Sequence, residues 1–278
     1  MELFISDLDG TLLNSQCVIS DFSVKTLNSL IEKGLQFTVA TARTYASAGK
    51  ILSGINLKLP VILMNGVLIF NPESRIYEKV CVLERSLVNL VINAKNKLGL
   101  DCFMYTLKDN LMHTYFEKIS SKAMEDFYLE RVHKYYKTFE KTDNFLNVNN
   151  DIIYFTFIDS KEKLQPLYDE LKCEKNLSLT FYGDVYNPEL WYLEAFSKEA
   201  SKKNGVLWIK ENYGFDKIYS FGDNTNDIPM FEIADVNFAV ENSAKELKEI
   251  ATQIIDSNNN DGVVKKICKI FKGGNHEK

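Results

Sequence analysis

Two acidic motifs in the chain each follow a short apolar segment. Asp7 and Asp9 lie two residues apart after one such segment, and Asp223 and Asp227 follow another. A carboxylate can attack phosphorus as a nucleophile, and a second carboxylate within reach can protonate the leaving oxygen and then activate water. Asp7 and Asp9 have the spacing for these two roles. Each motif alone is typical of a polar turn, and their shared position after apolar segments is what favours catalysis.

The four aspartates would repel one another if they met at one edge of a sheet. Such a cluster of negative charge needs a cation to neutralise it. Ligands that are all oxygen suit Mg²⁺ rather than Zn²⁺, and the three histidines are dispersed along the chain. The sequence therefore predicts a magnesium site built from aspartates.

The regions around the acidic motifs alternate between strand and helix patterns. We expect strands at 3–6, 37–40, 61–64, 218–221 and 236–240, and helices at 20–34, 44–52, 200–213 and 244–250. Short apolar runs that end in turn residues are typical of buried parallel strands. Because ligand sites lie at the carboxyl edge of a parallel sheet, this alternation predicts an α/β fold whose sheet edge gathers the aspartates.

The middle of the chain has a different pattern, in which aromatic-rich alternating stretches are separated by polar helical segments. We expect a Rossmann-like, parallel-sheet core formed by residues 1–82 and 188–278, with an α+β cap domain inserted at 83–187. The dense aromatic side chains of the insertion indicate packing more than stacking on a substrate. They include Phe103, Tyr105, Phe155, Phe157, Phe181 and Tyr182.

The composition excludes several classes of function. A net charge of -5 argues against nucleic-acid binding, which depends on clustered Lys and Arg. No apolar run reaches the roughly 18 residues that a transmembrane helix requires, and no secretion signal is visible at the start. The five cysteines are scattered and are expected to be reduced thiols. We therefore expect a cytoplasmic protein that binds neither nucleic acid nor membrane, as a monomer or homodimer.

A set of short motifs in order spans nearly the whole chain. They are Asp7-Leu8-Asp9-Gly10-Thr11, Thr41-Ala42-Arg43, Asn65-Gly66, a lysine before a helix, Gly222-Asp223 with Asn226-Asp227, and Asn242-Ser243-Ala244. Together they resemble the haloacid dehalogenase-like (HAD) hydrolases, and within these the Cof-type sugar-phosphate phosphatases, which carry a large inserted cap.

The resemblance implies a phosphatase for small phosphate monoesters, such as sugar phosphates or phosphorylated cofactors. It implies that Asp7 is the nucleophile that becomes phosphorylated and that Asp9 is the general acid and base. The implied Mg²⁺ ligands are Asp7, the Asp9 carbonyl and Asp223, supported by Asp227. The implied phosphate-binding residues are Leu8, Thr41, Ala42, Lys202 and Asn226. By the same resemblance the cap would close over the site and select the leaving group.

Thr41 and Arg43 belong to the second motif. Thr41 stands near the expected start of a helix, where backbone amides favour anions, although the residue also suits a simple N-cap. The usual motif has Gly where this chain has Ala42. Arg43 would reach the part of the substrate beyond the phosphate.

Three lysines are candidates for the catalytic cation: Lys198, Lys202 and Lys203. We favour Lys202, because similar family sequences place a Glu eight residues before the lysine, as Glu194 stands here. An exposed lysine on a helical face is the alternative for each. The role of the cation would be to neutralise charge on the nucleophile and the phosphate.

Two other functions remain open from the sequence. A phosphomutase or phosphotransferase would use the same Asp7 and Asp9 but would pass the phosphoryl group to another hydroxyl. A non-catalytic phospho-accepting switch would also combine an acidic metal pocket with Asp and Lys on a parallel sheet. Asp9 and a large insertion favour hydrolysis of a small molecule over signalling.

Overall fold

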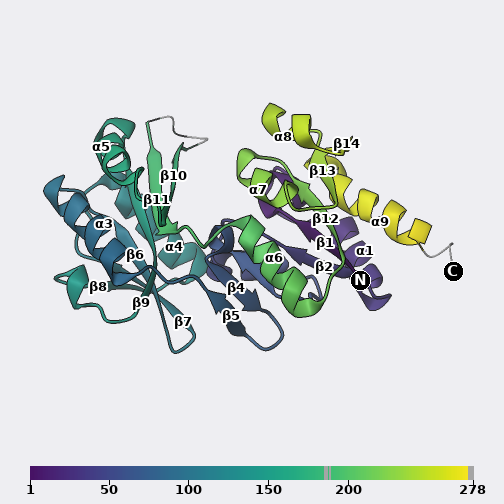
Figure 1. Cartoon of the computed structure of the whole chain (residues 1–278), viewed down its shortest axis with the longest axis horizontal. Coiled ribbons are helices and arrows are strands. Elements are labelled where there is room, and N and C mark those ends of the chain that lie inside the picture. The colour runs from purple at the N-terminus through teal and green to yellow at the C-terminus, as the bar shows by residue number, and fades with distance from the viewer. Residues whose placement is uncertain (185–186, 188, 275–278) are drawn as a thin grey trace. The chain divides into compact units, whose positions relative to one another are not determined.

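The computed structural model describes residues 1–184, 187 and 189–274, and the chain divides into two compact units. Unit 1 comprises Met1–Lys79 and Ser201–Lys278, and unit 2 comprises Val80–Ala200 (Figure 1). The first unit is thus built from both ends of the chain, and the second is inserted between them.

Unit 1 contains a five-stranded sheet in which every neighbouring pair is parallel. Its order is β14-β13-β12-β1-β2, so β1 lies between β2 and β12. The strands are β1 (Glu2–Ser6), β2 (Gln36–Val39), β12 (Lys217–Gly222), β13 (Val236–Val240) and β14 (Gln253–Ile255). The predicted α/β class with a parallel sheet is confirmed.

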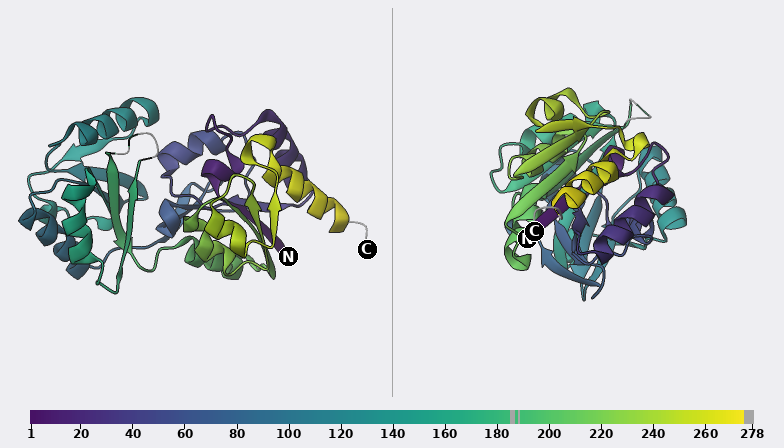
Figure 2. Two further views of the ribbon diagram at one scale, coloured as in Figure 1. Left: turned by 90° about the horizontal axis from the view of Figure 1, so that it is seen from above. Right: turned by 90° about the vertical axis from the view of Figure 1, so that its right-hand side faces the viewer.

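Helices cover both faces of this sheet. They are α1 (Asp21–Glu32), α2 (Tyr45–Leu52), α6 (Lys202–Tyr213), α7 (Ile228–Phe231), α8 (Lys245–Ile250) and α9 (Gly262–Gly274). On one face, Ile5 of β1 packs in a buried cluster with Val206 of α6 and Leu247 of α8. On the other, Lys266 of α9 lies 4.8 Å from the centre of the Phe238 ring, and α9 runs beside α1 (Figures 1 and 2). The sheet is therefore buried on both sides, as its apolar strands predict.

A second, three-stranded sheet follows α2; its first strand was expected at 61–64, whereas the other two strands were not among the expected elements. It consists of β3 (Val61–Leu63), β4 (Leu68–Asn71) and β5 (Ile76–Val80), in that order. A parallel bridge between Ala40 and Ile62 continues the end of β2 into β3. Between β3 and β4 the chain turns through residues 64–66, and this turn bears on the candidate site described below.

Unit 2 contains a six-stranded sheet of order β10-β11-β9-β6-β7-β8. The strands are β6 (Phe103–Lys108), β7 (Leu111–Phe116), β8 (Phe139–Lys141), β9 (Asp151–Asp159), β10 (Leu177–Gly183) and β11 (Trp191–Ser197). Helices α3 (Arg85–Lys97) and α5 (Lys161–Leu171) pack on one face through a continuous apolar cluster. Helix α4 (Lys122–Tyr135) lies on the other face, where Phe127 stacks on Phe103. Figure 1 shows this unit in blue to green.

The compact inserted unit extends beyond the expected 83–187. Strand β11 accounts for most of the difference at its carboxyl end, because it pairs antiparallel with both β10 and β9. Residues 191–197 therefore belong to the sheet of unit 2. The role of this unit in selecting the substrate stays a prediction.

Among the described residues, no helix is both long enough and apolar enough to cross a bilayer. The cytoplasmic location stays a prediction.

Candidate active site

Asp7 lies where strand β1 ends, in the interior of the parallel sheet between β2 and β12. Its backbone N–H donates to the Phe221 carbonyl at 2.9 Å, which extends the pairing of β1 with β12 by one residue. The Asp7 side chain is almost fully buried. The chain then turns at Gly10, whose φ is +74°, and a Cβ atom there would lie 2.3 Å from Oδ2 of Asp223. Only glycine lets the two loops approach this closely.

The loop after β12 brings Asp223 and Asp227 to the same edge of the sheet. The Thr11 hydroxyl donates to Oδ1 of Asp223 at 3.0 Å. Oδ2 of Asp227 accepts from the backbone N–H groups of Asp223 at 3.0 Å and Asn224 at 3.2 Å. Gly222 makes room for this carboxylate, because a Cβ there would lie 2.7 Å from Oδ2 of Asp227. Asp227 is therefore buried beneath the loop that presents Asp223.

Lys202 is the first residue of α6 and lies among these carboxylates. Its Nζ donates to Oδ1 of Asp7 at 2.5 Å and to Oδ1 of Asp227 at 2.6 Å. Its side chain is fully buried. The other candidates lie elsewhere: Lys203 pairs with Glu232 at 3.2 Å on the surface, and Lys198 is an exposed residue of unit 2. Lys202 is thus the candidate whose ammonium meets the acidic residues.

The Asn65-Gly66 turn fixes where α6 begins. Gly66 has a φ of +98°, and a Cβ there would lie 2.2 Å from the Ser201 carbonyl oxygen. Ser201 caps α6, since its hydroxyl accepts from the Asn204 N–H at 3.0 Å. The turn therefore packs directly against the residue before Lys202, which gives this motif a positional role.

The site contains more negative charge than its one ammonium neutralises. Burial raises the pKa of the Asp7 carboxyl well above its usual range. The Lys202 charge lowers this pKa, and the Asp227 and Asp223 charges raise it further. Burial, together with the Asp227 charge, raises the pKa of Asp223 to about 6. Burial alone would lower the pKa of Lys202, but Asp227 and Asp7 hold it above its ordinary value. Lys202 is therefore charged at neutral pH.

The same carboxylates fit a small divalent ion. One oxygen from each of Asp7, Asp223 and Asp227 lies within 4.8 Å of the other two. The donors are all carboxylate oxygens, which Mg²⁺ prefers, and three carboxylates meet a single ammonium, so a further positive charge would be stabilising here. The expected contribution of the Asp9 carbonyl stays a prediction.

The Asp9 side chain lies outside this cluster and is held by Arg43. Arg43 Nε donates to Oδ2 of Asp9 at 2.7 Å, and its Nη2 donates to Oδ1 at 2.5 Å. This is a bidentate pair, which fixes the plane as well as the position of a carboxylate. The sequence predicted that Arg43 would reach the substrate, whereas its guanidinium here contacts Asp9.

Thr41 is buried after β2, but it does not stand at the start of a helix. Helix α2 begins at Tyr45 with Thr44 as its N-cap, so the expectation that Thr41 offers a helix N-terminus is wrong. The Thr41 hydroxyl instead accepts from the Arg43 N–H at 3.2 Å. Leu8 is buried in the turn after Asp7.

Ala42 and Asn226 are exposed, and Ala42 is not among the residues with positive φ. A methyl group at position 42 therefore needs no unusual backbone conformation.

Two residues to which the sequence gave no individual role connect the loops of the site. The Asn242 side chain donates to the Gly10 carbonyl at 2.7 Å, and the Ser243 hydroxyl donates to the Gly222 carbonyl at 3.1 Å. The Ala244 N–H donates to the Asp223 carbonyl at 2.7 Å. The motif at 242–244 thus holds both acidic loops together. Such links depend on tertiary contacts that sequence spacing does not reveal.

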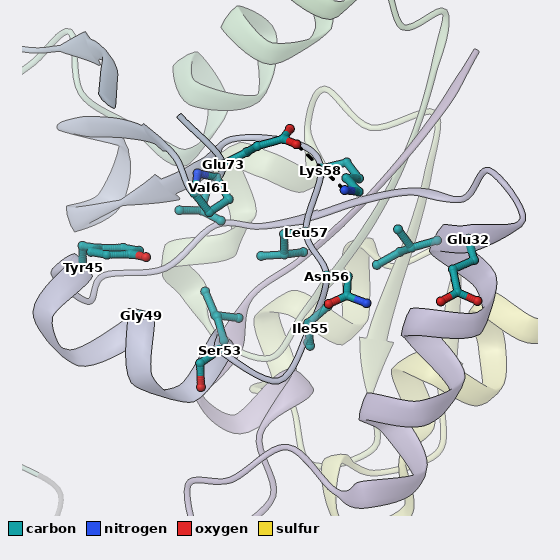
Figure 3. Close-up of a pocket in the computed structure, with 13 residues that line it drawn as sticks. Glu32, Tyr45, Gly49, Ser53, Ile55, Asn56, Leu57, Lys58, Val61 and Glu73 are labelled. Atoms are coloured by element: carbon teal, nitrogen blue, oxygen red, sulfur yellow. Dashed lines mark ion pairs between the residues drawn. The ribbon is translucent and has the colours of Figure 1, made fainter. Parts of the chain in front are cut away.

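A pocket of about 540 Å³ lies elsewhere on unit 1, beside α2 and the loop after it (Figure 3). Tyr45, Ile55 and Leu57 contribute to its lining, and Lys58 and Glu73 form an ion pair of 4.0 Å there. Among the described residues that line it, none is a predicted site residue. The chemistry is therefore concentrated at the sheet edge and not in this pocket.

The chain is similar to known proteins over nearly its whole length. A family model described as haloacid dehalogenase-like hydrolase matches residues 4–267. The 5-amino-6-(5-phospho-D-ribitylamino)uracil phosphatase YwtE of Bacillus subtilis is 25% identical over 297 residues, covering 98% of this chain and 99% of that protein.

Two solved structures share the fold. A haloacid dehalogenase-like hydrolase from Bacteroides thetaiotaomicron has a TM-score of 0.80 at 22% identity, covering 97% of this chain and 99% of that chain. The HAD subclass IIB sugar phosphatase BT4131 has a TM-score of 0.72 at 18% identity, with the same coverage.

We expect Gly66→Ala to destabilise the chain by roughly 2 kcal/mol or more, because the added methyl meets the Ser201 carbonyl. The matched control is Gly34→Ala: Gly34 has the same φ of +98° but nothing within 4 Å of the added atom. The free energy of unfolding of both variants is measured in urea. Both variants have the cost of backbone strain, and only Gly66→Ala also has the cost of the clash. Equal losses in the two variants would contradict the positional role of Gly66.

We expect Asp223→Asn to raise the midpoint of thermal unfolding at pH 7 in EDTA by roughly 2–4 °C. The folded-state pKa of Asp223 is about 6, above its ordinary 3.8, so the folded chain binds more protons than the unfolded chain between these values. The destabilising effect of Asp223 is therefore absent below pH 3.8, grows as the pH rises, and is complete above about pH 6.

Melting curves at pH 4 and pH 7 check this expectation, because the advantage of the Asp223→Asn variant should vanish at pH 4. Added MgCl₂ should stabilise the unchanged chain more than the variant, since bound ligand stabilises the folded state. A variant that melts lower than the unchanged chain at pH 7 in EDTA would argue against the charge excess.

Proposed function

This chain belongs to the haloacid dehalogenase-like hydrolases, and from that membership we propose that it is a magnesium-dependent phosphatase that hydrolyses small phosphate monoesters through a phosphorylated Asp7. The observation that carries the proposal is the contact of Lys202 Nζ with Asp7 at 2.5 Å and Asp227 at 2.6 Å, beside Asp223. A buried carboxylate held by an ammonium at the end of an interior strand is suited to act as a nucleophile.

Asp7 would attack phosphorus with Oδ2, because Lys202 occupies Oδ1. The Oδ2–P bond forms as the P–O bond to the alcohol breaks, and Lys202 stabilises negative charge on the transferring group. Water then attacks the acyl phosphate, which releases inorganic phosphate and restores the Asp7 carboxylate. A magnesium ion held by Asp7 and Asp223, with Asp227 in support, would supply positive charge against the phosphoryl oxygens.

Asp9 would give its proton to the departing alcohol and later accept one from the attacking water. In the structure both of its carboxylate oxygens accept from Arg43. Arg43 therefore acts as a positioning residue, which keeps the Asp9 carboxylate in one orientation beside the Asp7 turn. The phosphate-binding roles of Leu8, Thr41, Ala42 and Asn226 remain part of the proposal.

The substrate panel for this protein follows from its relatives and its sequence. The related YwtE is a phosphatase for 5-amino-6-(5-phospho-D-ribitylamino)uracil, so that compound belongs in the panel with sugar phosphates, flavin mononucleotide and pyridoxal phosphate. Release of inorganic phosphate, with and without Mg²⁺, is the measurement. An isomerised sugar phosphate without free phosphate would indicate a mutase instead, and an acyl phosphate that lasts for hours would indicate a switch.

We expect Asp7→Asn to lower kcat by about 1,000-fold or more, because the amide is a far weaker nucleophile. The fold should remain intact, since the substitution removes charge from a buried acidic cluster. Phosphate release and circular dichroism provide the two measurements. An Asp7→Asn protein with normal turnover would rule out the phosphoaspartate route.

We expect Arg43→Ala to lower kcat/KM for an alkyl phosphate about tenfold more than for p-nitrophenyl phosphate. The alkyl alcohol needs the Asp9 proton, whereas nitrophenolate leaves without it. Asp9→Asn should show the same selectivity, and the double variant should be no worse than Asp9→Asn alone. If Arg43→Ala lowered both substrates equally through KM, Arg43 would be a substrate ligand and not a positioning residue.

A further inference from the structure

The pocket beside α2 lies wholly within unit 1 and takes no part in the proposed phosphatase chemistry (Figure 3). Its volume of about 540 Å³ is within the range of small-molecule sites. Its walls come from the end of α1, from α2 and the loop after it, from β3, and from the turn between β4 and β5. Much of its lining is aliphatic and buried, namely Ile31, Leu52, Ile55, Leu57 and Val61.

Tyr45, the first residue of α2, presents a hydroxyl group to this pocket. Its ring centre lies 4.0 Å from that of Phe70 in β4. A Cβ atom at Gly49, one turn further along α2, would lie 3.0 Å from the Tyr45 ring, so the ring is confined on that side also. No other described residue hydrogen-bonds to the Tyr45 hydroxyl. The ring is therefore held in place, and its hydroxyl is available to a ligand.

Glu32 supplies the unbalanced charge of the pocket. Of the three charged side chains that line it, Lys58 and Glu73 pair with each other at 4.0 Å. Glu32 forms no ion pair with any residue that the structure describes. It is the last residue of α1, and the carboxyl end of a helix favours cations over carboxylates. A positive group in the pocket would therefore interact favourably with both the Glu32 carboxylate and the end of the helix.

The polar groups lie at opposite sides of the pocket. Figure 3 shows Tyr45 on one side and Glu32 on the other, with Leu57 between them. The Tyr45 hydroxyl points toward the side on which Leu57 lies. A ligand that reached both groups would be elongated, with a hydrogen-bonding group at one end, an apolar middle and a positive charge at the other end.

From this arrangement we propose that the pocket binds a hydroxyaryl amine. Its ammonium meets the Glu32 carboxylate, its ring packs on the aliphatic lining, and its hydroxyl bonds to that of Tyr45. A hydroxyl both donates and accepts, so two hydroxyls can pair in either direction. A ring also loses less conformational freedom on binding than a flexible chain of similar area. The inference does not depend on the proposed phosphatase, because no residue assigned to phosphate chemistry lines the pocket.

The test compares two small molecules that differ in the charge at one end. Tyramine carries a ring hydroxyl and an ammonium, and 3-(4-hydroxyphenyl)propionate carries a carboxylate in place of the ammonium. Binding to the full chain is measured by isothermal titration calorimetry, with excess MgCl₂ to compete for the acidic cluster around Asp7. We expect a Kd for tyramine on the order of 0.1–1 mM, and binding of the carboxylate at least about tenfold weaker.

Substitutions in the pocket locate the binding. We expect Glu32→Gln to weaken tyramine binding about tenfold, because the ammonium loses its charged partner. Tyr45→Phe should weaken it about threefold, because one neutral hydrogen bond is lost. The matched control is Asp21→Asn, which removes an exposed carboxylate at the other end of the same helix, outside the pocket. This variant should bind tyramine as the unchanged chain does.

Three outcomes would overturn the inference. No saturable tyramine binding up to about 10 mM would remove the site itself. Equal affinity of the unchanged chain and Glu32→Gln would place the binding elsewhere on the protein. Equal affinity for tyramine and the carboxylate would contradict the preference for an amine. Because calorimetry needs no turnover, each of these results stands apart from the outcome of the phosphatase assays.

Discussion

The contact of one buried ammonium with two buried carboxylates is the interaction on which the rest of the candidate site depends. Lys202 reaches Asp7 from β1 and Asp227 from the loop after β12, so it links three separate stretches of the chain. Buried ions are stable only when their partners are in place, and the loss of one partner leaves the others unpaired. The loops must therefore be held rigidly. Close contacts leave no room for a side chain at Gly10, which meets the Asp223 carboxylate, at Gly222, which meets the Asp227 carboxylate, or at Gly66, which meets the Ser201 backbone.

This arrangement explains why the site gathers at the carboxyl edge of a parallel sheet. There, successive loops leave the sheet in the same direction, and their residues converge without any one loop being long. The charge is still unbalanced, because one ammonium faces three carboxylates. A site of this kind is less stable than a neutral one, and binding of a divalent cation would relieve the repulsion among its carboxylates.

The sequence predicted the parallel sheet well, because its strands are short apolar runs and its helices have clear caps. Ser20, for example, begins the helix expected at 20–34, and it caps α1 because its hydroxyl accepts from the Ser23 N–H at 3.0 Å. The sequence did not predict the β4–β5 strands, the place of β11 in the unit 2 sheet, or the ion pair between Arg43 and Asp9. These features depend on which segments meet in space, and neither the periodicity nor the spacing of residues in the sequence indicates which segments meet. Likewise, Thr41 resembled the start of a helix that in fact begins at Tyr45.

Catalysis of phosphate release and choice of substrate are separate physical tasks. Every phosphate monoester presents the same charged group, so the cluster of Asp7, Asp223 and Lys202 has no means of telling one ester from another. Discrimination requires directional groups that meet the neutral part of a substrate, because a buried donor or acceptor left unpaired by the wrong ligand carries a large penalty. The phosphate chemistry proposed for Asp7 therefore leaves the choice of substrate to residues outside this cluster.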